Sequence, residues 1–472
     1  MASSLQFKSY KLSTLLLYLC ILIFIIGFNF TDSPPPPFGW YQQFMPNLGG
    51  RQINDIFFLD SLTGWAITNS LGQYDTAFVL RTTNGGDNWI ISYARSQQYT
   101  GFYRIYFLNS STGFICGVSQ YNGLKGLSKT NDGGFNWFDI NVPDPTLTYL
   151  DMNVLNEESI WLVSNNNPAG GVFRTTNGGI SWDRQFSGGT QNPNHVYMFD
   201  SQIGFITNHS ALPNIYRTTN SGLNWNVFVS GEYFVEMYFI DNLTGWRTAG
   251  DTMKFTSDGG FNWSRQVLPY GGMIESNVMT KFSVLNRDTL WGSGGYVHYP
   301  NNQLRGIIYR TTNGGINWLF QIPDTSMPIV AQYEFINFVN KNYGWCYANF
   351  PTYVSGIHTT TGGDSEWYTG IKQISSSVPK TFRLYQNYPN PFNPRTVINY
   401  ELRITSYVRL IVYDITGREV QRLVDQKQSA GEYEVDFMGK FVSSGVYLYR
   451  MQVTDEKGNK TFSDTKKMIL LK

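Results

Sequence analysis

The chain of 472 residues is long enough for two or more domains and a large buried core. Its 35 basic and 34 acidic residues nearly balance, and only 15% of residues are charged, which argues against nucleic acid as a partner because such partners usually require a basic patch. The aromatic content of 16%, together with 46 glycines, indicates many short strands joined by tight turns.

The N-terminus has the pattern of an export signal over residues 1–33. Lys8 and Lys11 precede an apolar run over residues 15–28, which is short for a membrane span. An uncleaved anchor is the alternative, because no clear pair of small residues marks a cleavage site. Residues 34–39 then form a proline-rich spacer, whose consecutive prolines favour a stiff, extended chain.

One eight-residue stretch, Thr82 to Trp89, recurs along most of the chain. Its tryptophans are spaced by 38 to 55 residues, a range typical of propellers and arrays of repeated units. An Asn or Asp followed by Gly-Gly between two apolar stretches predicts a tight hairpin turn, because glycine accepts positive φ without steric cost. The copies are Thr130–Trp137, Thr175–Trp182, Thr218–Trp225, Thr256–Trp263 and Thr311–Trp318, with a looser seventh copy ending at Trp367.

Each copy belongs to a longer unit that predicts four antiparallel strands. A first apolar strand is followed by a turn and a Gly-aromatic pair such as Gly64-Trp65. A second strand, a polar loop, a third strand, the repeated turn and a fourth strand then complete the unit. Seven such units over residues 40–374 predict a seven-bladed β-propeller. Two segments compete to close the ring as the last fourth strand, Trp40 to Phe44 and Trp367 to Ile374, and the first of these could also lie as an extra edge strand.

The repeated turn resembles the Asp-box of bacterial sialidases, sortilin-type receptors and photosystem II assembly-factor propellers, a family also known by its BNR repeats. The resemblance implies that the box is the turn between the third and fourth strands of a blade, that its tryptophan packs against the blade core, and that its role is structural. The residues assigned to it are Asn84, Trp89, Asp132, Trp137, Asn177, Trp182, Asn220, Trp225, Asp258, Trp263, Asn313, Trp318 and Trp367.

The repeat ends at a linker over residues 375–381. Residues 382–472 contain alternating apolar runs that predict a small immunoglobulin-like β-sandwich, so that the whole chain is all-β. The stretch from Leu384 to Pro394, followed by Val412–Arg418 and Ser443–Tyr447, resembles the type A C-terminal sorting domain of the type IX secretion system. That resemblance implies export, the secretion machinery as a partner, and either release or attachment to surface lipopolysaccharide.

The cysteines do not form a disulfide framework, since there are only three. Cys20 lies in the apolar N-terminal run. Cys116 and Cys346 fall in the second strands of non-adjacent units, where we expect buried free thiols rather than a bridge.

Loops opposite the boxes carry the candidate ligand-binding residues. These are Tyr74, Tyr99, Tyr103, Arg104, Tyr121, Asn166, His195, His209, Tyr296, His298 and Tyr353. Solvated loops of this composition are common in exported β-proteins. The alternative is a polar, aromatic mouth suited to a glycan or an extended peptide. We therefore expect a secreted or cell-surface binding or adhesion module with an unknown glycan or protein ligand.

The alternative function is a glycoside hydrolase of the sialidase or xyloglucanase-like type. Tyr103-Arg104-Ile105 resembles the sialidase Arg-Ile-Pro motif, but Tyr106 replaces the proline. Arginines that directly precede boxes repeat and so are expected to be structural, which leaves no visible arginine triad. A xyloglucanase-like site needs two propellers, and this chain has one. We expect no catalytic residues, no cofactor and no metal site, because the histidines are few and scattered.

Overall fold

A computed structural model describes residues 39–72, 75–96, 101–118, 126–166, 168–187, 192–208, 212–249, 252–271, 274–298, 303–323, 330–349, 354–364, 368, 370–439, 442–455 and 458–472. The expected export signal at 1–33 and all but the last residue of the spacer at 34–39 lie outside these residues. Within the described part, no helix is long and apolar enough to cross a membrane.

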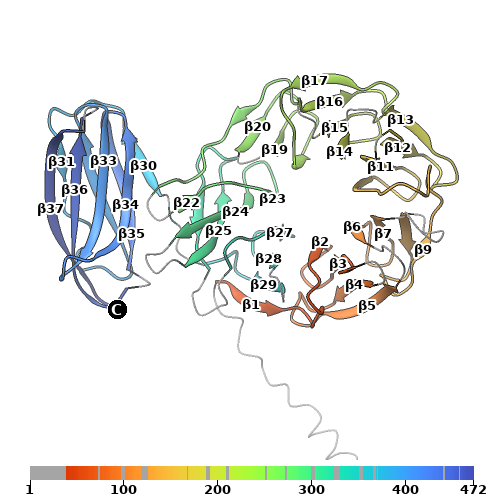
Figure 1. The fold of residues 1–472 in the computed structure, drawn as a ribbon, viewed down its shortest axis with the longest axis horizontal. Coiled ribbons are helices and arrows are strands. Elements are labelled where there is room, and N and C mark those ends of the chain that lie inside the picture. Colours follow the sequence, from red (N-terminus) through yellow and green to blue (C-terminus); the bar gives the residue numbers. More distant parts are fainter. Residues whose placement is uncertain are drawn as a thin grey trace, which may run out of the picture. The chain divides into compact units, whose positions relative to one another are not determined.

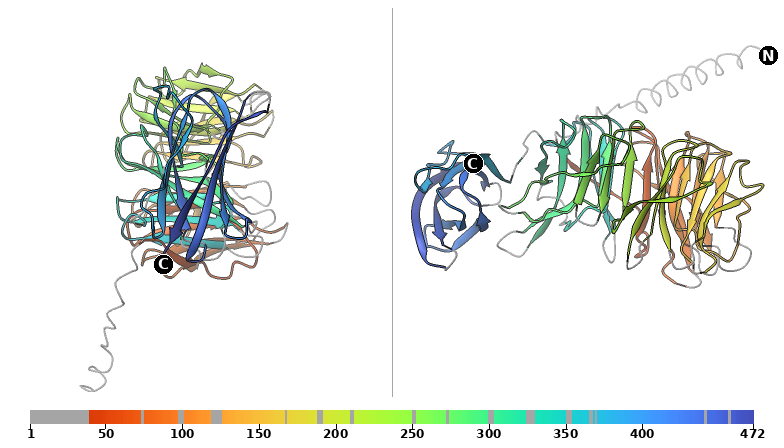
Figure 2. Two further views of the ribbon diagram at one scale, coloured as in Figure 1. Left: turned by 90° about the vertical axis from the view of Figure 1, so that its left-hand side faces the viewer. Right: turned by 90° about the horizontal axis from the view of Figure 1, so that it is seen from above.

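Seven antiparallel sheets surround a common axis and form the blades of a β-propeller (Figure 1), which confirms the expected fold. Figure 2 (right) shows their strands from the side, running between the two faces of the ring. The strands of each blade are given from the innermost outward. Blade 1 is β2 (Ile53–Phe58), β3 (Gly64–Thr68), β4 (Thr76–Thr82) and β5 (Ile90–Ser96), and blade 2 is β6 (Phe102–Phe107), β7 (Gly113–Gly117), β8 (Leu127–Thr130) and β9 (Phe138–Asp139). Blade 3 is β10 (Asp151–Val154), β11 (Ile160–Ser164), β12 (Gly171–Thr175) and β13 (Asp183–Ser187), and blade 4 is β14 (Pro193–Met198), β15 (Gly204–Asn208), β16 (Asn214–Thr218) and β17 (Asn226–Ser230).

The remaining blades follow the same order. Blade 5 is β18 (Glu236–Phe239), β19 (Gly245–Ala249), β20 (Thr252–Thr256) and β21 (Ser264–Arg265); blade 6 is β23 (Lys281–Val284), β24 (Leu290–His298), β25 (Leu304–Thr311) and β26 (Leu319–Gln321), with β22 (Ile274–Ser276) paired to the far half of β24; and blade 7 is β27 (Phe335–Phe338), β28 (Gly344–Asn349), β29 (Val354–Thr359) and β1 (Tyr41–Phe44).

Aromatic side chains fill the wedges between blades. Trp65 of β3 stacks on Phe107 of the next blade with ring centroids 3.5 Å apart, and Trp345 stacks on Phe58 at 3.7 Å. The glycine before each such tryptophan is needed because the innermost strand's last phenylalanine covers it: a Cβ on Gly64 would lie 2.6 Å from the ring of Phe58. Ring contacts of this kind contribute to stability beyond the area that they bury.

The repeated turn is closed by its own side chains. The hydroxyl of Thr82 accepts the N–H of Gly86 at 2.9 Å, and the Oδ1 of Asn84 accepts the N–H of Asn88 at 3.0 Å. Gly85 and Gly86 both have positive φ, of 70° and 88°. The box tryptophan that follows, Trp89, lies edge-on to Phe58 at 5.7 Å. The next five boxes repeat the two hydrogen bonds, at 2.8–3.0 Å.

The seventh blade is completed by the N-terminal strand. β1 pairs with β29, so Trp40 directly precedes a fourth strand as Trp89 precedes β5. Trp40 lies edge-on to Phe338 of its blade at 6.0 Å, and the N–H of Gly39 donates to Thr361 at 3.1 Å, where the other boxes use Asn or Asp. This last box is therefore assembled from two segments far apart in the sequence. Trp367, which we assigned to it, lies outside the described residues.

The described part of the competing segment does not pair with β29. Tyr368 forms a bridge with Phe320 of blade 6, and from Ile371 the chain joins the C-terminal domain. β30 (Ile371–Ser375) pairs with β35 (Gly431–Met438). The boundaries expected at residues 374 and 375–381 are thus corrected, because the sheet of the second domain already begins at Ile371. Two sheets make up this domain: β30, β35, β32 (Arg395–Leu402) and β31 (Arg383–Leu384) form one, and β34 (Glu419–Gln428), β33 (Ser406–Asp414), β36 (Gly445–Thr454) and β37 (Lys460–Leu470) form the other.

The stretch that opens this sandwich is anchored in its core. The side chain of Asn387 is buried and donates to Thr396 at 2.9 Å, while its backbone N–H donates to the hydroxyl of Tyr449 at 2.8 Å. Phe392 is buried against Phe437. The buried amide of Asn387 needs hydrogen-bond partners and finds them here, and Phe392 fills space in the core. These contacts give a physical reason for both residues of the motif.

The two cysteines in the described residues are free thiols, as expected. Cys116 and Cys346 are both fully buried, and burial raises the pKa of each thiol well above its ordinary value. Both therefore pack as small apolar side chains.

Candidate functional site

Six of the seven innermost strands carry an ionisable side chain at one corresponding position, three residues before the strand ends, and the seventh carries a phenylalanine there. We call this set the channel ring. In blade order its members are Asp55, Arg104, Asp151, His195, Glu236, Lys281 and Phe335. The repeat aligns the position around the axis, but the residue type differs from blade to blade. Acidic and basic or histidine side chains alternate over the first six blades.

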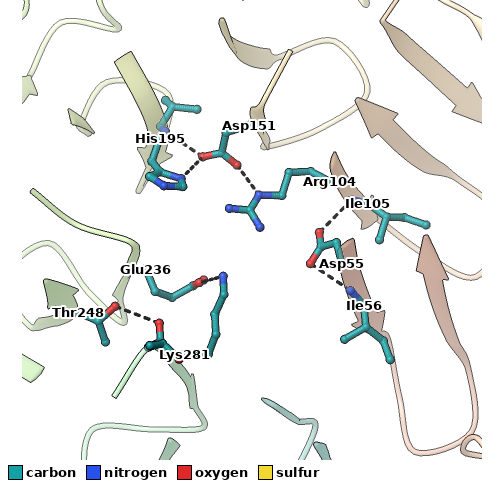
Figure 3. Close-up of polar contacts among 11 residues, drawn as sticks. Asp55, Ile56, Arg104, Ile105, Asp151, His195, Glu236, Thr248 and Lys281 are labelled. Carbon is teal, nitrogen blue, oxygen red and sulfur yellow. Dashed lines mark hydrogen bonds and ion pairs between the residues drawn. The ribbon is translucent and has the colours of Figure 1, made fainter. Parts of the chain in front are cut away.

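Members of the channel ring contact each other across blade boundaries (Figure 3). The Nε of Arg104 donates to Oδ1 of Asp151 at 2.8 Å, and Nδ1 of His195 lies 3.3 Å from Oδ2 of the same carboxylate. Lys281 forms an ion pair with Glu236. The ring therefore consists of one three-membered and one two-membered cluster, with Asp55 beside them.

Two carboxylates of the channel ring also accept hydrogen bonds from backbone N–H groups. The inner edge of each blade has no neighbouring strand, so its N–H groups need other acceptors. Asp55 accepts the N–H of Ile105 at 3.0 Å, and Asp151 accepts the N–H of Val196 at 3.1 Å, in each case from the next blade. These two carboxylates thus have a structural role in joining consecutive blades.

The electrostatics of the two aspartates differ. Burial raises the pKa of Asp55, partly offset by Arg104 and Lys281. Burial acts in the same direction on Asp151, but Arg104 and His195 outweigh it and hold the pKa of Asp151 at about 2. Burial acts to lower the pKa of Arg104, but the attraction of Asp151 and Asp55 outweighs it and raises that pKa above its ordinary value. The guanidinium therefore keeps its charge.

Some donors and acceptors of the channel ring are not used in hydrogen bonds within it. Among the described residues, the two terminal nitrogens of Arg104 and the Oε1 of Glu236 make no hydrogen bond. The side chains of Glu236, Arg104 and Lys281 are 34%, 23% and 21% exposed. Charged groups of both signs in the ring are therefore accessible to solvent.

The structure brings together only some of the residues expected to bind ligand. Arg104 and His195 meet at Asp151, and Tyr103 is the strand neighbour of Arg104. The other described candidates lie elsewhere. The Oδ1 of Asn166 accepts from Thr148 and Ser164 and so holds its own loop; Tyr296 and His298 are in β24, where His298 pairs with Glu275 at 2.5 Å.

The remaining candidates, Tyr74, Tyr99, Tyr121, His209 and Tyr353, lie outside the described residues. Five ring members were missed, the ionisable Asp55, Asp151, Glu236 and Lys281 and the apolar Phe335. Their shared position before the Gly-aromatic turn was visible in the sequence, although their convergence was not.

Several propeller arginines that do not directly precede a box form ion pairs. Each of four contacts its own carboxylate, and a fifth, Arg305, is buried. The pairs are Arg51 with Asp75, Arg95 with Asp139, Arg104 with Asp151, and Arg247 with Glu232. Only Arg104 belongs to the channel ring, so these arginines do not gather into one carboxylate-binding cluster.

Side chains that directly precede the boxes pack on the second-strand tryptophan of their blade. Arg81, Arg174 and Arg310 each lie over the second-strand tryptophan of their own blade, at 4.9 to 5.9 Å. His358 stacks on Trp345 in the same place at 4.6 Å. Within the described residues, no group of three or more His, Cys, Asp and Glu side chains is arranged to hold a metal ion.

Several solved structures are similar to this chain at low sequence identity. YCF48 bound to D1 peptide has 18% identity and a TM-score of 0.48, covering 69% of this chain and 98% of that one. The extracellular domain of BT4673 from B. thetaiotaomicron has 9% identity and a TM-score of 0.46, covering 92% and 59%. The GH74 xyloglucanase from Xanthomonas campestris has 9% identity and a TM-score of 0.38, covering 90% and 81%. Such distant likeness carries no information about ligand or reaction.

A search of curated proteins found no match. The scan against family models matched residues 386–470 to the secretion system C-terminal sorting domain. This match confirms the resemblance drawn from the motifs, and it implies that the chain is exported through interaction of this domain with the type IX secretion machinery.

Proposed function

We propose that the protein is an exported binding protein whose propeller holds an extended, charged peptide segment at the channel ring. The observation that carries the proposal is the alternation of acidic and basic side chains at one position of the innermost strands, with unused donors on Arg104 and an unused acceptor on Glu236. A peptide with side chains of both signs complements such a ring, whereas a neutral glycan would leave its charges unmatched.

Hydrolysis is supported less well by the same geometry. The pKa values of Asp55 and Asp151 are shifted in opposite directions, a pattern also found in acid and base pairs of enzymes. Each carboxylate, however, accepts a backbone N–H of the next blade, and Asp151 also binds Arg104 and His195. These bonds favour a fixed structural carboxylate over one that exchanges protons with a substrate.

Lys281 gives the sharpest test, because a matched control exists. Lys281 is 21% exposed and pairs with Glu236, while Lys129 is 24% exposed and pairs with Glu157 beside the boxes. Binding of the full chain to an immobilised library of charged peptides should weaken as salt rises. Lys281→Gln should then lower the affinity by about tenfold or more, and Lys129→Gln should not.

Failure of the library to retain the protein, or an equal loss in both variants, would contradict this proposal. Turnover of a glycoside by the purified chain without peptide binding would favour the hydrolase.

We further propose that the exported protein either is released or stays attached to surface lipopolysaccharide. The support is the sorting domain, whose resemblance to the type A family implies both fates. Cell fractionation combined with lipopolysaccharide-specific staining of the purified protein distinguishes them: a ladder of slower-migrating species indicates attachment, and a single species in the medium indicates release.

A further inference from the structure

A second polar site lies on the outer wall of the propeller, between blades 1 and 2. It is a groove of about 520 Å³. Its lining residues are Tyr93, Ala94, Arg95 and Ser96 of β5, and Trp137, Phe138 and Asp139 at β9. We call it the rim groove. None of its residues belongs to the channel ring.

The charges of the rim groove depart from the repeat. Asp139 is the second residue of its fourth strand, and the corresponding residues of the other blades are not acidic. They are Ile91, Arg184, Val227, Arg265, Phe320 and Gln42. Features that serve blade packing recur in most blades, as the boxes do, so an acidic residue present at this position in only one blade is not explained by the architecture of the repeat.

An ion pair fixes the two charges across the blade boundary. Arg95 is 10% exposed, and its Nη2 donates to Oδ1 of Asp139 at 2.9 Å and to the hydroxyl of Ser128 at 3.2 Å. The Ser128 hydroxyl in turn donates to the same Oδ1 at 2.7 Å. Neither Nη1 of Arg95 nor Oδ2 of Asp139 makes a hydrogen bond to any described residue. The pair is therefore rigid, close to neutral overall, and keeps one donor group and one acceptor for a ligand.

An aromatic side chain stands beside this pair. Phe138 is 61% exposed although it is one of the largest apolar residues, and Tyr93 is partly buried with its hydroxyl 3.4 Å from Nε of Arg95. Exposed aromatic faces next to fixed polar groups are typical of sites that bind a ligand with one apolar and one polar side.

We propose that the rim groove binds a neutral saccharide. A pyranose ring has an apolar C–H face that can stack on Phe138, and hydroxyls at its edge that can donate to Oδ2 of Asp139 and accept from Nη1 of Arg95. An anionic ligand is disfavoured by Asp139 and a cationic one by Arg95. The site is independent of the peptide proposed for the channel ring.

The test uses the purified full chain on an array of neutral, acidic and N-acetylated glycans. Binding to at least one neutral glycan is expected, and Phe138→Ala and Asp139→Asn should each weaken it by about tenfold. Ile90→Ala is the matched control, because Ile90 holds the corresponding position in blade 1, is 52% exposed and does not line the groove. Its affinity should stay within about twofold, and so should that of Lys281→Gln.

Thermal unfolding of each variant distinguishes loss of a contact from loss of the fold. Phe138→Ala should leave the melting temperature unchanged, because the ring is mostly in solvent. The proposal is overturned by an array without any bound neutral glycan, or by binding that survives both groove substitutions.

Discussion

Removing the side chain of Trp40 should open the propeller at its closing blade. Trp40 is 5% exposed, lies edge-on to Phe338, and donates from Nε1 to Gln321 at 3.0 Å. Burying an aromatic side chain of this size removes about 150–250 Å² from water, and truncating a buried tryptophan to alanine costs about 3–5 kcal/mol. β1 has only four residues, which pair with β29, and its Tyr41 and Gln43 side chains also hydrogen-bond His358 and the carbonyl of Gly85. Trp40 contributes the largest buried apolar side chain of this segment.

Hydrogen exchange of the full chain, resolved by mass spectrometry, measures this locally. In Trp40→Ala, peptides covering β29 should lose protection, while peptides covering β10 to β13 should keep it. The corresponding Trp89→Ala in blade 1 should lose protection around β4 and β5 instead. Trp40→Phe should have a smaller effect, because it keeps the aromatic packing and loses only the bond to Gln321. Unchanged protection of β29 in Trp40→Ala would refute the assignment of Trp40 to the seventh box.

Three further predictions concern acid stability, packing and export. Burial holds the pKa of His358 at about 3, below its ordinary value of 6.5. Between these two pH values the imidazole is therefore protonated in the unfolded chain and neutral in the folded chain. The free energy of unfolding should therefore fall as pH drops from 6.5 toward 3, by up to about 1.4 kcal/mol per unit, and His358→Gln should flatten that slope in urea titrations. Gly344→Ala should cost about 1–3 kcal/mol, because its Cβ would lie 2.3 Å from the ring of Phe338, whereas Gly445→Ala, with nothing within 4 Å, should change stability by less than about 0.5 kcal/mol in the same denaturation assay. Deleting Thr381 to Lys472 should leave the protein in the periplasm, and fractionation that still finds it on the cell surface would show that another signal directs export.

The fold was predictable because its signals are local. Each box is made by residues within eight positions of one another, so the hydroxyl of Thr82 and the amide of Gly86 meet whatever the rest of the chain does. The Gly-aromatic pair is similar, since the phenylalanine that covers Gly64 is six residues away. Repetition of these short patterns was enough for the number of blades, and the motifs from Leu384 to Pro394 were enough for the sorting domain.

The candidate site was predictable only in part. Arg104 and His195 were predicted in loops opposite the boxes and lie instead in β6 and β14. Asp151, which joins them, was not predicted, because a single acidic residue in an apolar strand gives no information about its neighbours in space. The rim groove was missed for the same reason: Arg95 and Asp139 are 44 residues apart and come from different blades.

Local sequence patterns were sufficient to predict the repeating blade, the all-β class and the C-terminal domain, because the motifs that identify them each lie within a few residues. Contacts between distant segments determine which segment closes the ring, which charges meet at the channel ring, and where the second domain begins. Gly39 and Thr361, which share the last box, are 322 positions apart. Two segments of similar pattern could have completed that blade, and only the pairing of β1 with β29 and of β30 with β35 distinguishes them.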